Sequence, residues 1–503
     1  MSSLSDQMRV NRPVPDESPN EVSERLRVVL ATDPTVAIAE ARMALKSSRD
    51  DSMRAAVAGV LVDAGEAAGD REATKVGMTA IKGLLAKDPS NGGLRYMLGT
   101  AGLSMARHDK TPKPEWWEVT RKLQTDARRN LWEAAEAELH QAIRAQAWIN
   151  LGNNLDEGGR WAEAYEAHTA AMRVDPGNPV AAGQAALLLH ARGSSPGGPE
   201  WQPIAHRLAR IAQSKHDQVA QIAPGAQVRY AALPTDRADE AVLPEQVHLS
   251  SYQRYVADNR LHLSMALDAM HPECWDSLDL PMLTEPMDIG SHPPPLFAMF
   301  NSCKADYLLA RQLAWDGMQV DDDDQHHYTN TLDYACYGDG PSRTVLAMRS
   351  ALDVLDRVAV MANSYFDIGQ KPKDVYFRTA WREDSTGRPL RSVVADEIDS
   401  RNWGVLALAT LAEDFRDDGW LFGRQRLRNI ATHRFVISHS MMTGNWRDVS
   451  EIEHLSDVDL DASVISALRI ARSALMYLVD AVARREHRRP EGASLPLCLP
   501  RLG

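Results

Sequence analysis

The sequence predicts an all-α protein in two parts, a superhelix of helical repeats followed by a C-terminal helical bundle. One observation is a pattern of small and apolar residues with a period of about 34 residues in the first half. The other is a series of segments after Phe300 in which apolar residues recur at helical spacing. With 503 residues, 44% of them hydrophobic, each part has enough apolar side chains to form its own core.

The first 21 residues are polar and contain several prolines, so they are expected to be disordered. No apolar run approaches the roughly 20 residues that span a bilayer, which argues against a membrane protein. Four cysteines are scattered without close pairing, which excludes a disulfide framework and a zinc finger and favours the cytoplasm. These cysteines are Cys274, Cys303, Cys336 and Cys498.

A helical repeat is clearest in the stretch AWINLGNNLDEGGRWAEAYEAHTAAMRVDPGN, residues 147–178. Its residues fit the tetratricopeptide repeat: Gly152 and Ala164 are small where two helices meet, a Gly-Gly pair makes the turn, and Asp175-Pro176 ends the second helix. A weaker copy in the same register ends at Asp88-Pro89. We therefore assign residues 22–240 to a TPR-like repeat domain.

Stacked repeats usually present a concave groove, so we expect a protein partner there, with a purely structural spacer as the alternative. His168 takes a bulky position inside its hairpin and is interpreted as a packed ring rather than a ligand.

The repeat pattern weakens after GSSPGGPE at Gly193 and ends in ALPTDRADEAVLPEQ, which places a boundary near residue 240. A segment from about 240 onward is then expected to fold by itself. Residues 241–295 are rich in proline and predict an extended connection packed on the second domain.

The second domain is assigned to residues 296–489, followed by a flexible tail, 490–503. Its predicted helices cover 300–318, 348–366 and 403–415, then a helix beginning near Gly423, and a long helix through 464–482. The insertion at 370–390 is compatible with a lid, a dimer arm or a substrate-guiding loop, and the sequence does not choose among them.

The fourth of these helices carries Arg428, Asn429 and His433, a combination suited to cleaving RNA without a metal. Histidine can act as base or acid near neutral pH, and arginine offers a fixed fork of donors to phosphate oxygens. Further arginines at 424, 426 and 434 concentrate positive charge within a chain of net charge -13, which indicates a local polyanion site. We therefore assign Arg424, Arg426 and Arg434 to RNA binding.

On a helix, Asn429 and His433 lie one above the other at i and i+4, whereas Arg428 and His433 are about 140° apart. Either the long arginine curls around the helix, or two copies of the motif face each other across a subunit boundary.

The region from Tyr252 to His439 resembles the HEPN superfamily (higher eukaryotes and prokaryotes nucleotide-binding), in the branch that follows TPR-type repeats. The stretches that carry the resemblance are YQRYVADNRL, PPPLFAMFNSCKADYLLARQLAWDG, TLDYACYGDG, RSALDVLDRVAVMANSYFDIG and LRNIATHRF. The last contains the superfamily's R-N-x-x-x-H signature. Relatives often carry an acidic residue where this chain has Thr432, so no supporting carboxylate is transferred.

The resemblance implies a metal-independent endoribonuclease that dimerises through its HEPN domain, needs no cofactor, and acts as a toxin or in antiviral defence. Catalysis then falls to Arg428, Asn429 and His433. The alternative is a non-catalytic module that binds RNA or a nucleotide, and a pure scaffold is a third interpretation. The acidic run from Asp321 to His327 is interpreted as a solvated loop, and the arginines after Ala483 mainly as a favourable helix end.

Overall fold

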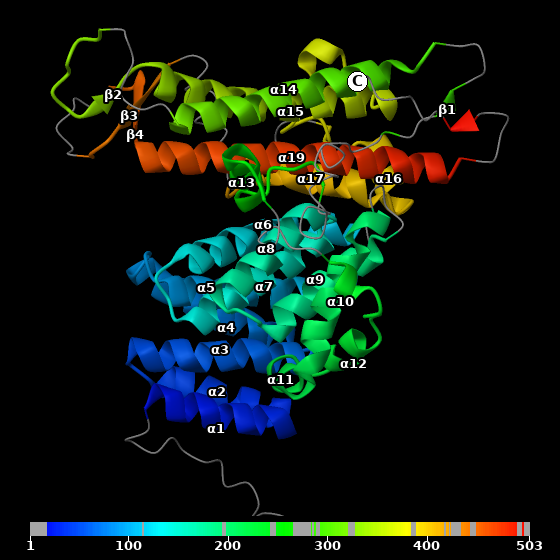
Figure 1. Cartoon of the computed structure of the whole chain (residues 1–503). Coiled ribbons are helices and arrows are strands. Elements are labelled where there is room, and N and C mark those ends of the chain that lie inside the picture. The colour runs from blue at the N-terminus through cyan, green and yellow to red at the C-terminus, as the bar shows by residue number, and fades with distance from the viewer. Residues whose placement is uncertain are drawn as a thin grey trace, which may run out of the picture. The chain divides into compact units, whose positions relative to one another are not determined.

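The computed structural model describes most of the chain, and it is built almost wholly from helices (Figure 1), which confirms the predicted all-α class. The described residues are 18–112, 115–193, 198–241, 248–264, 283, 286–287, 292–319, 327–383, 389–416, 419–421, 423, 434–442, 449–489 and 495–496.

The first half is a succession of helices joined by short turns, as expected for repeated helical hairpins. They are α1 (Pro19–Thr32), α2 (Pro34–Ser47), α3 (Asp51–Ala68), α4 (Arg71–Lys87), α5 (Gly92–Arg107), α6 (Glu115–Glu136), α7 (Gln141–Glu157), α8 (Trp161–Val174), α9 (Pro179–Ala191), α10 (Gly198–Ser214), α11 (His216–Ile222) and α12 (Ala226–Ala231). The packing of α3 on α4 and of α5 on α6 supports the TPR-like pattern.

The first helix begins earlier than the sequence predicted. Ser18 and Glu21 form a reciprocal capping box, and Pro19 occupies the first turn, where its missing N–H costs nothing. The predicted disordered start, 1–21, is therefore wrong for its last residues, and residues 1–17 lie outside the described part.

The α7–α8 hairpin has the features that its sequence indicated. Gly159 makes the turn with φ of 76°, and a Cβ there would lie 2.6 Å from the carbonyl oxygen of Trp403. His168 is buried in α8, and burial lowers the pKa of its imidazole to about 3, as expected for a packed neutral ring.

The chain forms two compact units, and the division between them falls within this hairpin. One unit contains residues 1–154 and 170–176, and the other contains 155–169 and 177–503. The boundary near residue 240 expected from composition differs from this division, because the start of α8 and all of α9 to α12 belong to the C-terminal unit.

After residue 294, the C-terminal unit is built around four helices, α14 (Pro295–Gln319), α15 (Asp339–Tyr365), α17 (Trp403–Asp414) and α19 (Asp457–His487). Helix α14 packs on α15, and α15 and α17 both pack on α19 (Figure 1). Residues 404–414 of α17 are buried throughout, so this helix is the centre of the core. Shorter elements are α13 (Ser251–Asp258), α16 (Ser392–Asp399), and 3-10 turns at Ala238–Glu240 and Pro372–Asp374.

Two segments expected to lack regular structure contribute to this core. The connection at 241–295 contains α13, which starts with a capping box at Ser250, and the following turn is fixed by the Tyr307 hydroxyl, 2.6 Å from the Leu261 carbonyl oxygen. In the 370–390 insertion, Phe377 and Trp381 are buried and the Phe377 N–H donates to Asp356. The described part of the insertion is therefore packed rather than a free lid or arm.

The strands were not predicted from the sequence. β2 (Ala335–Cys336) pairs antiparallel with β3 (Phe435–His439), which pairs in parallel with β4 (Ile452–Ser456). This small sheet lies at one end of α14, α15 and α19 (Figure 1). A second pair joins β1 (Pro286–Met287) to β5 (Leu495–Pro496), so part of the predicted flexible tail is paired.

Helix α19 has the length and mean hydropathy of a membrane span, contrary to the expectation that no apolar run reaches that length. However, 78% of its apolar window is buried inside the protein. Its hydropathy is accounted for by its place in the core.

Candidate functional site

The structure describes one of the six residues assigned to the site. Arg434 is exposed, and its Nη1 donates to the carbonyl oxygen of Ser450 at 2.7 Å. The other five lie outside the described residues: Arg424, Arg426, Arg428, Asn429 and His433. What the structure defines is how the chain enters and leaves this segment.

The chain enters the segment through a tight turn that is fixed to the last residue of α17. The Asp414 carbonyl oxygen accepts the N–H of Leu421 at 2.8 Å, and its carboxylate accepts the indole N–H of Trp420 at 2.5 Å. Leu421 is buried. Residues 420 and 421 are therefore held by both backbone and side-chain bonds.

The chain leaves the segment through β3. The N–H of Phe435 donates to the Glu451 carbonyl oxygen at 3.0 Å, and the parallel ladder runs from Phe435 opposite Ile452 to His439 opposite Ser456. Twelve residues, 422–433, thus connect two fixed points, and they contain the whole R-N-x-x-x-H motif.

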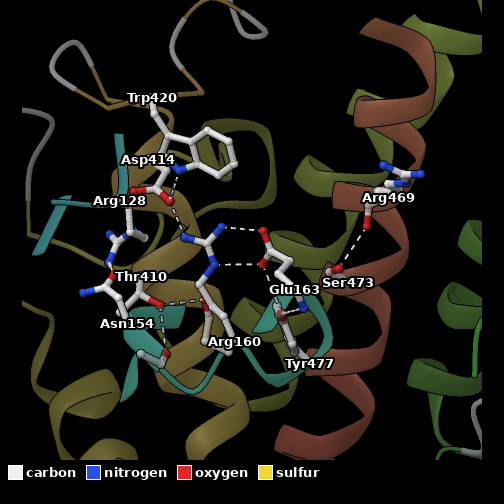
Figure 2. A network of polar contacts seen from close by, with 12 residues as sticks. Arg128, Asn154, Arg160, Glu163, Thr410, Asp414, Trp420, Arg469, Ser473 and Tyr477 are labelled. Atoms are coloured by element: carbon white, nitrogen blue, oxygen red, sulfur yellow. Dashed lines mark hydrogen bonds and ion pairs between the residues drawn. The ribbon is translucent and has the colours of Figure 1, made fainter. Parts of the chain in front are cut away.

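Asp414 is part of a buried network of charges (Figure 2). Arg160, in the α7–α8 turn, donates through Nη1 to the Asp414 carboxylate, and neither side chain is exposed. Its Nε and Nη2 donate to the two carboxylate oxygens of Glu163 at 2.8 and 2.5 Å. The Tyr477 hydroxyl on α19 donates to Glu163 at 3.0 Å.

The charge states in this network follow from its composition. Burial alone lowers the pKa of the Arg160 guanidinium, but the Glu163 and Asp414 carboxylates raise it above its ordinary value, so it stays charged. Burial, reinforced by Glu163, raises the pKa of Tyr477, which keeps its hydroxyl protonated and able to donate. No sequence pattern indicates this network, because Arg160 and Glu163 are far from Asp414 and Tyr477 in the chain.

Comparison with known protein families identifies the family of the C-terminal region. Residues 287–485 match the family described as LA2681-like HEPN. This region is a HEPN domain. The match overlaps the expected domain, 296–489, along almost its whole length and spans the R-N-x-x-x-H segment. No curated protein matches the chain.

A HEPN domain indicates an RNA-related function. Within it, the segment that holds the motif, 422–433, lies in the sequence between the turn that follows α17 and the strand β3. The TPR-like character of the first half is supported by its helical hairpins alone.

The HEPN domain also contains a histidine pair that was not predicted from the sequence. His439 Nδ1 lies 2.9 Å from the carbonyl oxygen of Asp333, and its Nε2 lies 2.7 Å from Nδ1 of His454. A carbonyl oxygen only accepts, so a neutral His439 donates through Nδ1 and accepts through Nε2 from His454. The pair links β3 to β4 and to the residues before β2, and the spacing of residues within these short strands does not indicate it.

Exposed aromatic rings lie on the same part of the HEPN domain. Phe435 at the start of β3 is 68% exposed, and Tyr328 (52%) stacks on Tyr337 (39%) with ring centroids 6.1 Å apart. Since consecutive Cα atoms are about 3.8 Å apart, the Cα atoms of Phe435 and His433 are within about 8 Å in any conformation.

Proposed function

We propose that this protein is a metal-independent endoribonuclease whose HEPN domain cleaves RNA through Arg428, Asn429 and His433. The observation that carries the proposal is the family match, which spans a complete R-N-x-x-x-H motif. On either side of the segment that contains the motif, the described residues are held by backbone hydrogen bonds, Leu421 to Asp414 and Phe435 to Glu451.

The proposed reaction is an internal transesterification. The 2′-oxygen of the substrate attacks the adjacent phosphorus and loses its proton to a base, while the bond to the 5′-oxygen breaks and that oxygen takes a proton from an acid. The products are a 2′,3′-cyclic phosphate and a free 5′-hydroxyl. His433 serves as base or acid, Arg428 stabilises the added charge on the phosphorane, and Asn429 orients the phosphate or the histidine.

Three further arginines are proposed to hold the RNA backbone: Arg424, Arg426 and Arg434. Arg434 is exposed next to the motif, and its bond to the Ser450 carbonyl oxygen uses one of its five donors. In a chain of net charge -13, this cluster offers a phosphate strand a local site.

A homodimer through the HEPN domain is part of the proposal. On one helix Arg428 and His433 point about 140° apart, and two facing motifs overcome that separation. Each chain then contributes to both sites, as in a composite active site.

The repeats are proposed to bind a protein that controls cleavage. In the first unit a pocket of about 460 Å³ is lined by apolar side chains, among them Leu45, Val76 and Leu84, and by charged ones, among them Lys75 and Lys87. A lining that combines apolar and charged side chains suits a peptide segment. We further propose that the protein acts in the cytoplasm, in antiviral defence or as a toxin.

The second candidate function is binding of RNA or a nucleotide without cleavage. The same family match supports it, since the match concerns the domain and not its chemistry. Incubating purified protein with end-labelled RNA in excess chelator separates the two. New ends with 2′,3′-cyclic phosphate support the enzyme, whereas retention of intact RNA supports the binding module. Cleavage that requires added magnesium contradicts the proposed mechanism.

A further inference from the structure

Two pockets of the first unit lie on either side of helix α4. One has a volume of about 460 Å³ and is enclosed by α4 together with Leu45 of α2 and Arg54 of α3. The other has a volume of about 480 Å³ and is enclosed by α4, α5 and α6. Because α2, α4 and α6 are the second helices of successive hairpins, both pockets lie along the layer that these second helices form.

The exposed side of α4 forms a ridge between the two pockets. At about 100° per residue, four exposed residues fall on this side of the helix, namely Lys75, Thr79, Lys82 and Gly83. Gly83 lines the first pocket and Lys82 lines the second. A Cβ added at Gly83 would contact nothing within 4 Å, so the ridge is low and open at this point. A bound chain that crosses α4 at Gly83 therefore reaches both pockets.

The linings of the two pockets carry an excess of positive charge. Six lining residues are cationic, namely Arg54, Lys75, Lys82, Lys87, Arg95 and Arg129. Three are anionic, namely Glu72, Asp126 and Glu133. Just outside the linings, Asp51 pairs with Lys87 and Lys122 pairs with Asp126, and these two opposite charges leave the excess unchanged. In a chain of net charge -13, such a surface suits an anionic partner.

The apolar side chains of the linings favour a protein over a nucleic acid as that partner. They include Leu45, Val76 and Leu84 in the first pocket and Leu98 and Leu123 in the second. No aromatic side chain is among the residues that line either pocket, so nucleobases have no ring to stack on there. A segment that alternates aliphatic side chains with carboxylates matches both the apolar lining and the positive charge.

We propose that Lys82, Gly83 and the two flanking pockets form a docking surface for an acidic amphipathic segment of a protein partner. This inference rests on the proposed binding of a controlling protein to the repeats, and it assigns the place and the chemistry of that partner. The segment crosses α4 at Gly83, buries aliphatic side chains in both pockets and places carboxylates beside Lys75 and Lys82.

The test selects binders of the full-length protein from random peptides displayed on phage. A selected peptide is then synthesised, and its affinity is measured by fluorescence anisotropy. We expect the selected sequences to be rich in acidic and aliphatic residues. Lys82→Glu should weaken binding of the peptide by about fivefold or more, because it replaces an attractive charge by a repulsive one. Lys373→Glu is the control, since Lys373 is an exposed lysine of the other unit.

A second pair of variants tests the place of binding without changing the charge. Gly83→Trp puts a large side chain on the low point of the ridge and should weaken binding by about tenfold or more. Gly83→Ala should bind the peptide like wild type and should melt at the same or a higher temperature, because alanine favours a helix more than glycine does. Melting temperatures show whether each variant is folded.

Wild-type affinity in Gly83→Trp or in Lys82→Glu overturns the proposal, and so do selected peptides that are neutral or basic. In those cases the protein still binds peptides, and only the proposed place or chemistry is wrong. If no peptide sequence is enriched, the proposed binding of a protein by the repeats is contradicted as well. RNA binding that weakens in Lys82→Glu while peptide binding does not change assigns the surface to RNA instead. A sedimentation coefficient that differs between Gly83→Trp and Gly83→Ala assigns it to self-association.

Discussion

Arg472 on α19 donates to Glu166 on α8, with Nη1 2.6 Å from Oε1, and its Nη2 donates to the Ser264 carbonyl oxygen at 3.2 Å. The guanidinium thus joins a helix of the repeat pattern to the HEPN domain and to the segment that precedes it. Hydrophobic contact supports the same connection, since Trp161 packs edge-on against Tyr477 with ring centroids 6.2 Å apart. The last repeats are structural parts of the C-terminal unit.

A fragment that begins near residue 240 is therefore expected to be unstable, contrary to the expectation from sequence. It loses three charged residues whose partners stay buried in the remainder, namely Arg160 with Asp414, Glu166 with Arg472, and Arg192 with Asp480. Removing one partner of a buried pair typically costs about 3–5 kcal/mol.

The measurement is the thermal unfolding transition of the fragment, monitored by circular dichroism. A fragment that starts at Gln141 serves as the control, because it retains α7 to α10. The shorter fragment should melt without cooperativity or express in insoluble form. A cooperative transition at the temperature of the longer fragment contradicts this division of the chain.

The difference between sequence and structure here has a physical cause. Apolar spacing located α14, α15, α17 and α19, and the small residues and turn signals located the α7–α8 hairpin, because these patterns are local. The choice of Asp414 as the partner of Arg160 is not local, since 254 residues separate them. The composition around residue 240 indicates that the sequence pattern changes there. It does not indicate which helices pack into the same core.

The small sheet and the candidate site also could be predicted only in part from local sequence patterns. β3 and β4 are short, contain histidine and serine, and pair with each other across an irregular connection, while β2 comes from about 100 residues earlier. The residues of the motif were found by their type and spacing, and the family match covers them. The geometry of the motif residues does not follow from their spacing, and Arg428, Asn429 and His433 lie outside the described residues.

His168 predicts a specific dependence of stability on pH. Its imidazole has a pKa of about 3 in the folded protein, against 6.5 ordinarily. Between these values the unfolded chain binds a proton that the folded protein does not, so stability falls as pH drops below about 6.5 and is fully present above it. At about pH 5 the expected loss from this group is about 2 kcal/mol.

Replacing the ring removes that loss. In His168→Leu, the drop in denaturant midpoint between about pH 7.5 and about pH 5 should be smaller than in wild type by the corresponding amount. His216→Ala, at an exposed histidine, serves as the control. The same drop in His168→Leu as in wild type shows that the buried imidazole does not contribute.

Phe435 is expected to stack on a base of the RNA substrate. It is 68% exposed and lies two residues after His433. A stacked base contributes about 1–3 kcal/mol, so Phe435→Ala should raise KM by about fivefold or more with kcat little changed. Val458→Ala, at a residue 72% exposed, is the control for loss of exposed apolar surface. An unchanged KM in Phe435→Ala removes this residue from the RNA site.

The composite site predicts complementation between inactive chains. Arg428→Ala and His433→Ala are each expected to be inactive, and mixed dimers should recover part of the activity because one of their two sites contains both intact residues. The mixture is assayed after subunit exchange, with each variant alone as the control. Absence of recovery in a mixture that sedimentation shows to contain heterodimers places both residues of one site on a single chain.

Metal-free cleavage through His433 is tested by the rate of RNA cleavage by His433→Ala in excess chelator, beside wild type and His216→Ala. The proposed mechanism predicts that wild type and His216→Ala cleave at similar rates and leave 2′,3′-cyclic phosphate ends. His433→Ala should be slower by at least about 100-fold, as expected for loss of a general acid or base. Cleavage by His433→Ala at the wild-type rate, or cleavage by wild type that stops in chelator and returns with magnesium, contradicts this mechanism.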